Sequence, residues 1–155
     1  MNFKPEMKSK EQIASEQPKY ELATKYMVPV AGMITVSPDQ KINEVIEIFI
    51  QKRISGAPVL DMQKKLVGII SEKDCLRIII DQAYHNLPAG DRMVSDYMTA
   101  KVKTLSSTST IVDAADEFLN SPVRRLPIVD NGILVGQVSR RDILRAAKNI
   151  KATTW

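Results

Sequence analysis

The stretch GQVSRRD, from Gly136 to Asp142, has a near-copy, GIISEKD, that runs from Gly68 to Asp74. Both read as glycine, a pair rich in apolar side chains, serine, two charged residues and aspartate. Apolar residues followed by serine, with an acidic residue three positions later, are typical of a strand that leads into a helix. The copies lie 68 residues apart, so the sequence predicts the same strand-to-helix junction twice.

The repetition extends upstream of this junction over a whole structural unit. Residues 34–61 align with residues 103–130 at an offset of 69, which becomes 68 after a turn that is one residue shorter. The alignment places Pro58 opposite Pro127. One such unit is too small to bury a sufficient core alone, so we expect the two to share one.

Each unit predicts a strand, a helix, a hairpin and a second helix. The first helices have apolar side chains at helical spacing. These are Ile42, Val45, Ile46, Phe49 and Ile50 in the first unit and Ile111, Ala114, Ala115, Phe118 and Leu119 in the second. The second helices carry Leu76, Ile79, Ile80, Ile143, Leu144 and Ala147. Asp39 and Thr108 are the predicted N-caps of the first helices, and Asn131-Gly132 is a strong hairpin signal.

Composition is that of an ordinary folded protein. Of the 155 residues, 44% are hydrophobic and 26% are charged. A single cysteine, Cys75, excludes an internal disulfide and fits a reducing cytosol. The N-terminal stretch is too polar for a secretory signal and no apolar run approaches the ~20 residues of a membrane span, so we expect a cytoplasmic protein without a membrane partner. A net charge of +4 and 5% aromatic residues disfavour nucleic acid as a partner.

The chain divides at its polar and breaker-rich segments. A short lead-in helix is expected after Pro18. The predicted segments are a polar tail (1–20), the first repeat (21–83), a linker (84–93), the second repeat (94–149) and a C-terminal tail (150–155).

The four segments APVLD, LPIVD, GIISEKD and GQVSRRD, at matching distances in both units, resemble the tandem CBS domain, or Bateman module, over about residues 24–149. The resemblance implies an α+β fold in which two βαββα CBS repeats pack with pseudo-twofold symmetry and leave two clefts. Such modules bind AMP, ADP, ATP, S-adenosylmethionine or sometimes NAD, regulate rather than catalyse, and often pair into homodimers.

The resemblance also implies a set of ligand-binding residues. Asp74 and Asp142 would accept hydrogen bonds from a ribose hydroxyl pair, and Ser71 and Ser139 would face phosphate. Residues on the first strands and before the prolines would border the base, and arginines would bind phosphate. The complete predicted set is Thr35, Val36, Ala57, Pro58, Ser71, Asp74, Thr104, Leu105, Arg124, Arg125, Leu126, Pro127, Ser139, Arg140 and Asp142.

The same residues can also be explained by structural roles that need no ligand. Serine with an acidic residue three positions later is close to a capping box, which competes with a ligand for the carboxylate oxygens. Surface arginines are commonly just solvated. The pair Arg124-Arg125 corresponds to Ser55-Gly56 in the first unit, so we hypothesise unequal clefts in which the arginine-rich half supplies most of the anion binding. The first cleft then needs Arg53 or a residue from the other half.

The leading functional hypothesis is a free-standing regulatory module that senses an adenosine-containing ligand and signals to an unidentified downstream protein by population shift. The alternative is a ligand-free scaffold for dimerisation or protein interaction. An enzyme is not expected, because the sequence has no catalytic triad, Gly-rich phosphate loop or metal constellation. No cofactor is expected beyond the regulatory ligand, an adenine nucleotide or S-adenosylmethionine, and His85 with Cys75 makes no common zinc site.

Overall fold

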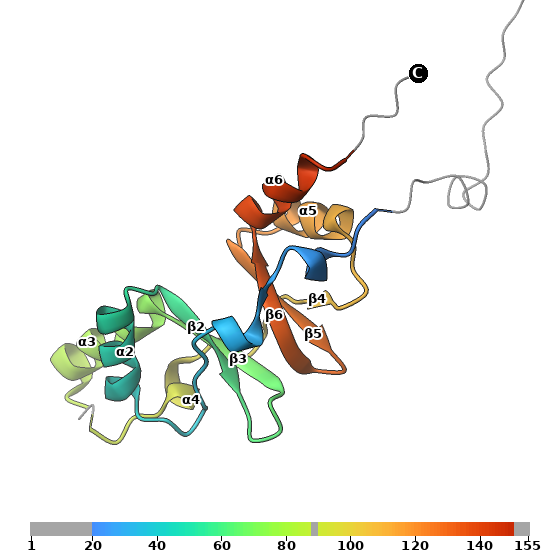
Figure 1. The fold of residues 1–155 in the computed structure, drawn as a ribbon. Coiled ribbons are helices and arrows are strands. Elements are labelled where there is room, and N and C mark those ends of the chain that lie inside the picture. Colours follow the sequence, from blue (N-terminus) through green and yellow to red (C-terminus); the bar gives the residue numbers. More distant parts are fainter. Residues whose placement is uncertain (1–19, 88–89, 151–155) are drawn as a thin grey trace, which may run out of the picture.

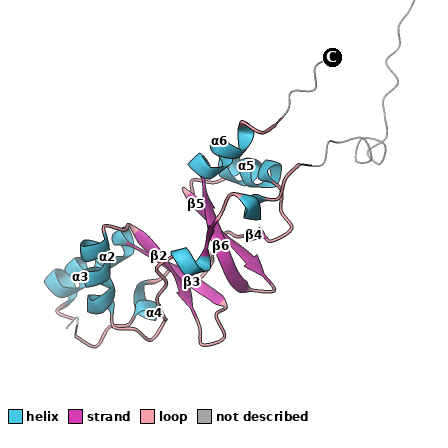
Figure 2. Ribbon diagram, viewed as in Figure 1, coloured by secondary structure: helices cyan, strands magenta, loops and turns pink. Residues whose placement is uncertain are grey.

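A computed structural model describes residues 20–87 and 90–150 of the chain. The predicted tails, 1–20 and 150–155, lie outside the described residues except for one residue each. Two sheets lie in the middle of the molecule, with one pair of helices at each far end (Figures 1 and 2). This layering is the α+β arrangement of two repeats that the sequence predicts.

The helix, hairpin and second helix of each half occur in the predicted order. The elements are η1 (Ala23–Lys25), β1 (Val28–Pro29), η2 (Val30–Gly32), α2 (Ile42–Lys52), β2 (Gly56–Leu60), β3 (Leu66–Ser71), α3 (Glu72–His85), α4 (Val94–Tyr97), β4 (Leu105–Ser106), α5 (Ile111–Asn120), β5 (Arg125–Asp130), β6 (Ile133–Ser139) and α6 (Arg140–Ala147). The predicted first strand of the first half is a single bridge at Val36, and β1, η2 and α4 were not predicted. The predicted lead-in helix is the single 3-10 turn η1. Helix α3 includes the first two residues of the predicted linker.

Both halves have the same strand arrangement. The second half forms a sheet in the order β1-β6-β5-β4, in which β4 runs parallel to β5. In the first half β2 and β3 form the hairpin. Val36 forms a parallel bridge to Val59 at the β2 edge of this hairpin, and Thr99 forms an antiparallel bridge to Ile69 at the β3 edge. The hairpin signal is confirmed, because Asn131 and Gly132 connect β5 to β6 with positive φ angles of 49° and 82°.

The segments that lead into the two halves are exchanged between them. Strand β1, which precedes the first half, pairs with β6 of the second, and Ala23 is buried in the second core. In return, Val94 and Tyr97 of α4, which precede the second half, are buried in the first core. Each core is therefore completed by a segment that belongs to the other repeat in the sequence.

Helices α2 and α5 each bury three of the five side chains of their predicted apolar stripes. Ile42, Val45 and Phe49 are buried in α2, as are their counterparts in α5. The predicted N-caps are wrong by two residues. Helix α5 is capped by Thr110, and α2 begins after Lys41 with no side-chain cap. The reason is again the exchanged segments, because the first amide of α2 donates to the carbonyl of Arg92 in the segment before α4.

The second helix of each half turns its longest apolar side chains outward. In α3 the side chains of Leu76 and Ile79 are each 59% exposed, and in α6 Leu144 is 70% exposed. Asp74, Cys75 and Ile78 take the buried positions of α3 instead. The outer helix surfaces are consequently more apolar than the sequence periodicity alone indicates.

Candidate functional site

Each predicted junction forms a complete capping box at the end of a strand. In the first half Ser71 Oγ accepts the backbone N–H of Asp74 at 3.3 Å, while Asp74 Oδ2 accepts the backbone N–H and the hydroxyl of Ser71 at 2.9 and 2.8 Å. Ser139 and Asp142 repeat these contacts in the second half at 2.8 to 3.2 Å. The structural explanation therefore holds at both junctions, and it uses only one of the two carboxylate oxygens.

The first cleft lies beside Asp74, between the two halves, with a volume of about 380 Å³. Its lining residues are Ile69, Ser71, Lys73, Asp74, Arg77, Thr99, Lys101, Val102, Lys103, Val123 and Arg125. Five of them are cationic, and Asp74 is the one acidic residue among them. The first half contributes Asp74, Lys73 and Arg77, and the second contributes Arg125 together with the two lysines before Thr104. The cleft thus combines a carboxylate with a positive field that both halves produce.

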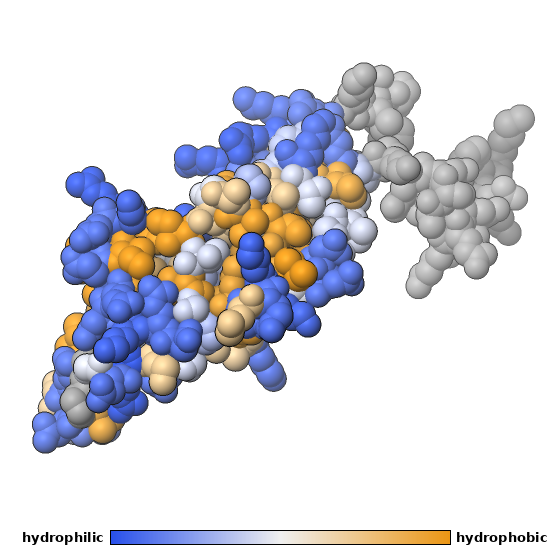
Figure 3. Space-filling view, turned by 60° about the horizontal axis from the view of Figure 1, so that its bottom comes forward, coloured by the Kyte–Doolittle hydropathy of each residue, from blue (hydrophilic) through white to orange (hydrophobic). Residues whose placement is uncertain are grey.

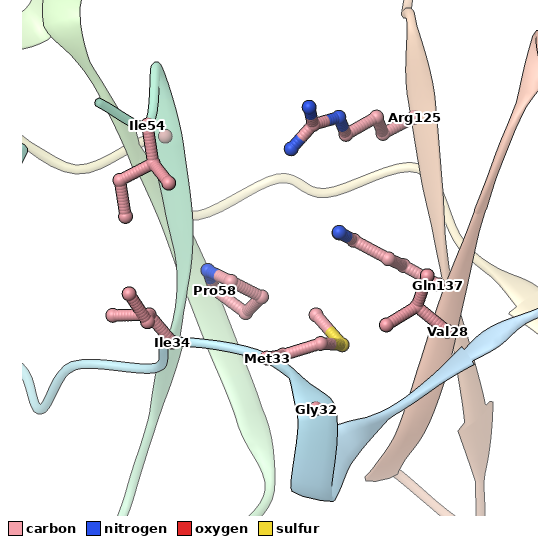
Figure 4. Close-up of a pocket in the computed structure, with 9 residues that line it drawn as sticks. Val28, Gly32, Met33, Ile34, Ile54, Pro58, Arg125 and Gln137 are labelled. Carbon is pink, nitrogen blue, oxygen red and sulfur yellow. The ribbon is translucent and has the colours of Figure 1, made fainter. Parts of the chain in front are cut away.

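The second cleft is the counterpart of the first, with a volume of about 200 Å³. Its lining residues are Val28, Gly32, Met33, Ile34, Ile54, Gly56, Pro58, Arg125 and Gln137. Figure 4 shows Met33, Ile34 and Pro58 beside this cleft, with Arg125 and Gln137 reaching into it from the opposite half. Its lining is mainly apolar, and Figure 3 shows an apolar band across the middle of one face of the molecule. A smaller hollow of about 80 Å³, bordered by Ala57 and Pro127 among others, lies between the halves.

The two aspartates differ in their second oxygen. Asp142 Oδ1 pairs with the guanidinium of Arg145 one turn along α6, so both oxygens of this carboxylate have partners. In the described part of the chain, Asp74 Oδ1 accepts no hydrogen bond. Asp74 can therefore accept hydrogen bonds from a ligand while its capping box stays intact.

The structure divides the predicted site residues into three groups. Ser71, Asp74 and Arg125 come together in the first cleft. Pro58 borders the second cleft and the middle hollow, which Ala57 and Pro127 also border. The remaining residues line none of these three hollows, and they are Thr35, Val36, Thr104, Leu105, Arg124, Leu126, Ser139, Arg140 and Asp142.

Most of that last group has a visible structural role. Val36, Leu105 and Leu126 are buried in the two cores. Arg140 donates to the carbonyl of Val123 at 3.2 Å and borders a hollow of about 590 Å³ between α5 and α6. Arg124 is exposed beside the first cleft.

Sequence reasoning missed four cations of the first cleft. Lys73 and Arg77 follow the junction serine on α3, and Lys101 and Lys103 precede the first strand of the second half. The alternation Lys-Val-Lys directly before Thr104 was an available signal, because the aligned positions in the first repeat are Gly-Met-Ile. Lys103 also forms an ion pair with Glu117 at 3.1 Å.

Titratable groups near the site show the expected effect of burial. Burial, together with the neighbouring charges of Asp74 and Glu72, raises the pKa of the Cys75 thiol to about 11. Burial and a hydrogen bond to Asp81 raise the pKa of Tyr97. The cysteine is therefore a protonated, buried side chain.

Residues 20–87 and 90–150 contain neither a metal-ligand cluster nor a membrane-spanning helix. Within them, no three His, Cys, Asp or Glu side chains are grouped so as to hold a metal ion. None of the helices in this part of the chain has the length and apolarity that a membrane crossing requires.

Fold and cleft together define a tandem-repeat module with a basic cleft between its halves. The model of the CBS domain family matches the chain twice, at residues 23–81 and 94–149. The chain therefore belongs to the CBS domain family and carries two CBS domains in tandem. Both the family resemblance and the fold predicted from the sequence are confirmed.

Curated relatives and solved structures agree with this assignment. The uncharacterized protein MJ1225 of Methanocaldococcus jannaschii is 30% identical over 114 residues, which cover 74% of this chain. The chloroplastic CBS domain-containing protein CBSX1 of Arabidopsis thaliana is 29% identical over 150 residues, which cover 81% of this chain. The chain spans only 39% of the length of MJ1225 and 64% of CBSX1. The structure of CBSX2 in complex with AMP matches with a TM-score of 0.73 and 29% identity, over 84% of this chain and 98% of that one.

Proposed function

We propose that this chain is a regulatory module that binds an adenosine nucleotide in the first cleft. The observation that carries the proposal is the carboxylate of Asp74, which faces a basic cleft with one oxygen held by its capping box and the other without a partner among the described residues. The volume of about 380 Å³ lies within the ~300–1,000 Å³ of small-molecule sites. A related solved structure, CBSX2, is described as a complex with AMP.

The proposed mechanism uses residues of both halves. Asp74 Oδ1 accepts hydrogen bonds from the vicinal ribose hydroxyls, and the cations of the cleft, Arg125 among them, neutralise phosphate. Because Asp74 belongs to the first half and Arg125 to the second, a bound nucleotide favours the arrangement of the halves that brings the two together. In this proposal the chain regulates rather than catalyses, and a downstream protein binds one arrangement of the halves better than the other.

The observed asymmetry also redefines the hypothesis of unequal clefts. Arg125 of the second half lines the cleft of Asp74, so the half that lacks an arginine pair adds cations of the other half to its own Lys73 and Arg77. S-Adenosylmethionine, which carries no phosphate, makes less use of these cations than AMP, ADP or ATP. A location in the cytoplasm remains part of the proposal.

Thermal unfolding with AMP, ADP, ATP, S-adenosylmethionine, NAD and guanosine controls tests this function. At a concentration of ~100 times Kd, binding adds about 2.7 kcal/mol to the free energy of unfolding. The midpoint then rises by about 5–10 °C for a chain of this size. The rise should disappear in Asp74→Ala and persist in Asp142→Ala, which loses an equivalent capping box. No rise with any of these compounds would reject the proposal.

A second candidate function, a scaffold that acts by dimerisation, is favoured by a duplicated surface. Ile50 and Leu119 are aligned in the two repeats and are 68% and 86% exposed, and the aligned pair Leu76 and Leu144 is 59% and 70% exposed. A surface duplicated by pseudo-twofold symmetry can meet the same surface of a second copy at both ends. We propose a homodimer that pairs through these outer helices, whether or not a nucleotide is bound.

A further inference from the structure

The repeat relates the two clefts position by position, and their charges differ. The first cleft has Lys101, Lys103 and Arg125 where the aligned positions of the second cleft are Gly32, Ile34 and Gly56. The other two cations of the first cleft, Lys73 and Arg77, align with Arg141 and Arg145 of α6, which do not line the second cleft, so Arg125 is the one cation of its lining. A nucleotide phosphate in the second cleft therefore has a single candidate counter-charge among the lining residues.

That single counter-charge also belongs to the first cleft. Arg125, at the start of β5, lines the first cleft, the second cleft and the small hollow between them. Figure 4 shows its side chain reaching from β5 across the gap toward Ile54 and Pro58. One guanidinium thus stands where the two clefts meet.

The two junction aspartates also favour binding in the first cleft. In the second half a ribose would have to displace Arg145 from Asp142 before it could bind there. In the first half Asp74 Oδ1 accepts no hydrogen bond from the described residues. The capping boxes are alike and Arg77 is aligned with Arg145, but Arg77 makes no ion pair with Asp74 and lines the first cleft instead.

We infer that Arg125 is shared by the two clefts and limits the chain to one bound nucleotide, held in the first cleft. The inference rests on the proposed function. A phosphate in the first cleft attracts the guanidinium of Arg125 to itself, where the four other cations of that cleft also lie. The second cleft is then left with apolar side chains and a glutamine, which cannot neutralise a second phosphate.

Isothermal titration calorimetry of the full chain with ATP tests the stoichiometry. Wild type should bind one ATP per chain, Asp142→Ala should keep one site with a Kd within about twofold, and Asp74→Ala should show no saturable binding. Circular dichroism confirms that each variant is folded. Two sites per chain, or two-phase heats, would overturn the inference and leave the proposed function standing. A folded wild type that binds no nucleotide would overturn both.

A second set of variants tests the sharing of Arg125. Arg125→Ala should weaken ATP binding at least about tenfold, because a charge-assisted contact is lost. Lys65→Ala, which removes the same charge from the β2–β3 turn, should not change it. The double variant Ile34→Lys/Arg145→Ala gives the second cleft a lysine where the first cleft has Lys103 and releases Asp142, and it should bind two ATP per chain. A single site in this folded double variant would contradict the explanation.

Discussion

At the scale of single residues, the two junction glycines are explained by the exchanged segments. A Cβ at Gly136 would lie 2.5 Å from the carbonyl oxygen of Val28 and 2.6 Å from Sδ of Met27. A Cβ at Gly68 would lie 2.7 Å from Sδ of Met98. The glycine that marks each repeat is therefore required by the chain that crosses over it.

This contact predicts a specific cost for a methyl group. Gly136→Ala should lower the free energy of unfolding by about 1–3 kcal/mol, because the crossing backbone of Val28 must move. Urea denaturation followed by circular dichroism measures the change. Gly90→Ala is the matched control, since no atom lies within 4 Å of its added Cβ. Equal stability of Gly136→Ala and wild type would show that the leading segment does not cross at this point.

The thiol of Cys75 gives a second prediction at this scale. Burial raises its pKa from 9.0 to about 11, so the folded state favours the protonated form. The free energy of unfolding should therefore fall as the pH rises from 9 to about 11, where the unfolded thiol ionises first. At pH 8, iodoacetamide should react at least about 100-fold more slowly with folded than with urea-unfolded protein. Comparable rates would place the thiol at the surface.

At the scale of elements, the beginnings of α3 and α6 are built alike and differ in use. Each helix is capped by a serine whose hydroxyl accepts the backbone N–H of the aspartate three residues later, and both capping boxes are complete. The first opens on the basic cleft, whereas Ser139 and Asp142 of the second line none of the hollows described above. The same local structure thus serves stability in both halves and, in our proposal, ligand binding in one.

Serine variants should separate these two roles. Ser71→Ala and Ser139→Ala should each cost about 1 kcal/mol of stability, the usual value of a lost N-cap. Only Ser71→Ala should also weaken nucleotide binding, because only Ser71 lines the first cleft. Chemical denaturation and calorimetry on the same samples measure both effects. Weakened binding in both variants would assign a ligand to the second junction as well.

The cations of β5, α3 and the segment before β4 predict how affinity depends on phosphate number. Five cations line the first cleft, and several are exposed to solvent. Each added phosphate should therefore contribute about 0.2–1 kcal/mol, the range for exposed ion pairs, so that ATP binds more tightly than ADP and ADP more tightly than AMP. The preference should shrink when salt is raised from about 0.05 to 0.5 M. Tighter binding of AMP than of ATP at low salt would contradict this reading of the cleft.

At the scale of the whole molecule, the exchange of leading segments holds the halves together. Each core contains side chains from the segment that precedes the other half, so neither half completes its core alone. The tyrosines of the two leading segments repeat this pattern. Tyr97 donates to Asp81 of α3 at 2.8 Å, and Tyr26 accepts from Asn149 just after α6 at 2.8 Å.

The outer helix surface predicts the oligomeric state. Leu76→Glu/Leu144→Glu places a charge at the aligned exposed position of α3 and α6, and it should raise the dimer dissociation constant at least about tenfold, or 1.4 kcal/mol. Light scattering after gel filtration over a concentration series measures this. Met62→Glu is the control, because Met62 is 97% exposed in the hairpin turn away from these helices. An unchanged mass would place the interface elsewhere.

The sequence by itself determined the two units, their element order and both capping boxes. These features depend on residues close in the chain, such as Ser71 with Asp74 or Asn131 with Gly132, and local patterns describe such contacts well. The same patterns misplaced two helix caps and gave no warning that Leu144 points outward.

Tertiary structure alone decided which residues meet across the halves. The exchange of leading segments and the meeting of Asp74 with Arg125 bring together residues that lie far apart in the sequence, and no local pattern indicates these contacts. Aligned positions have nearly the same backbone, so the repeat predicts symmetry. Many of the side chains at those positions differ, and the net charge of a cleft is known only when the structure shows which of them line it.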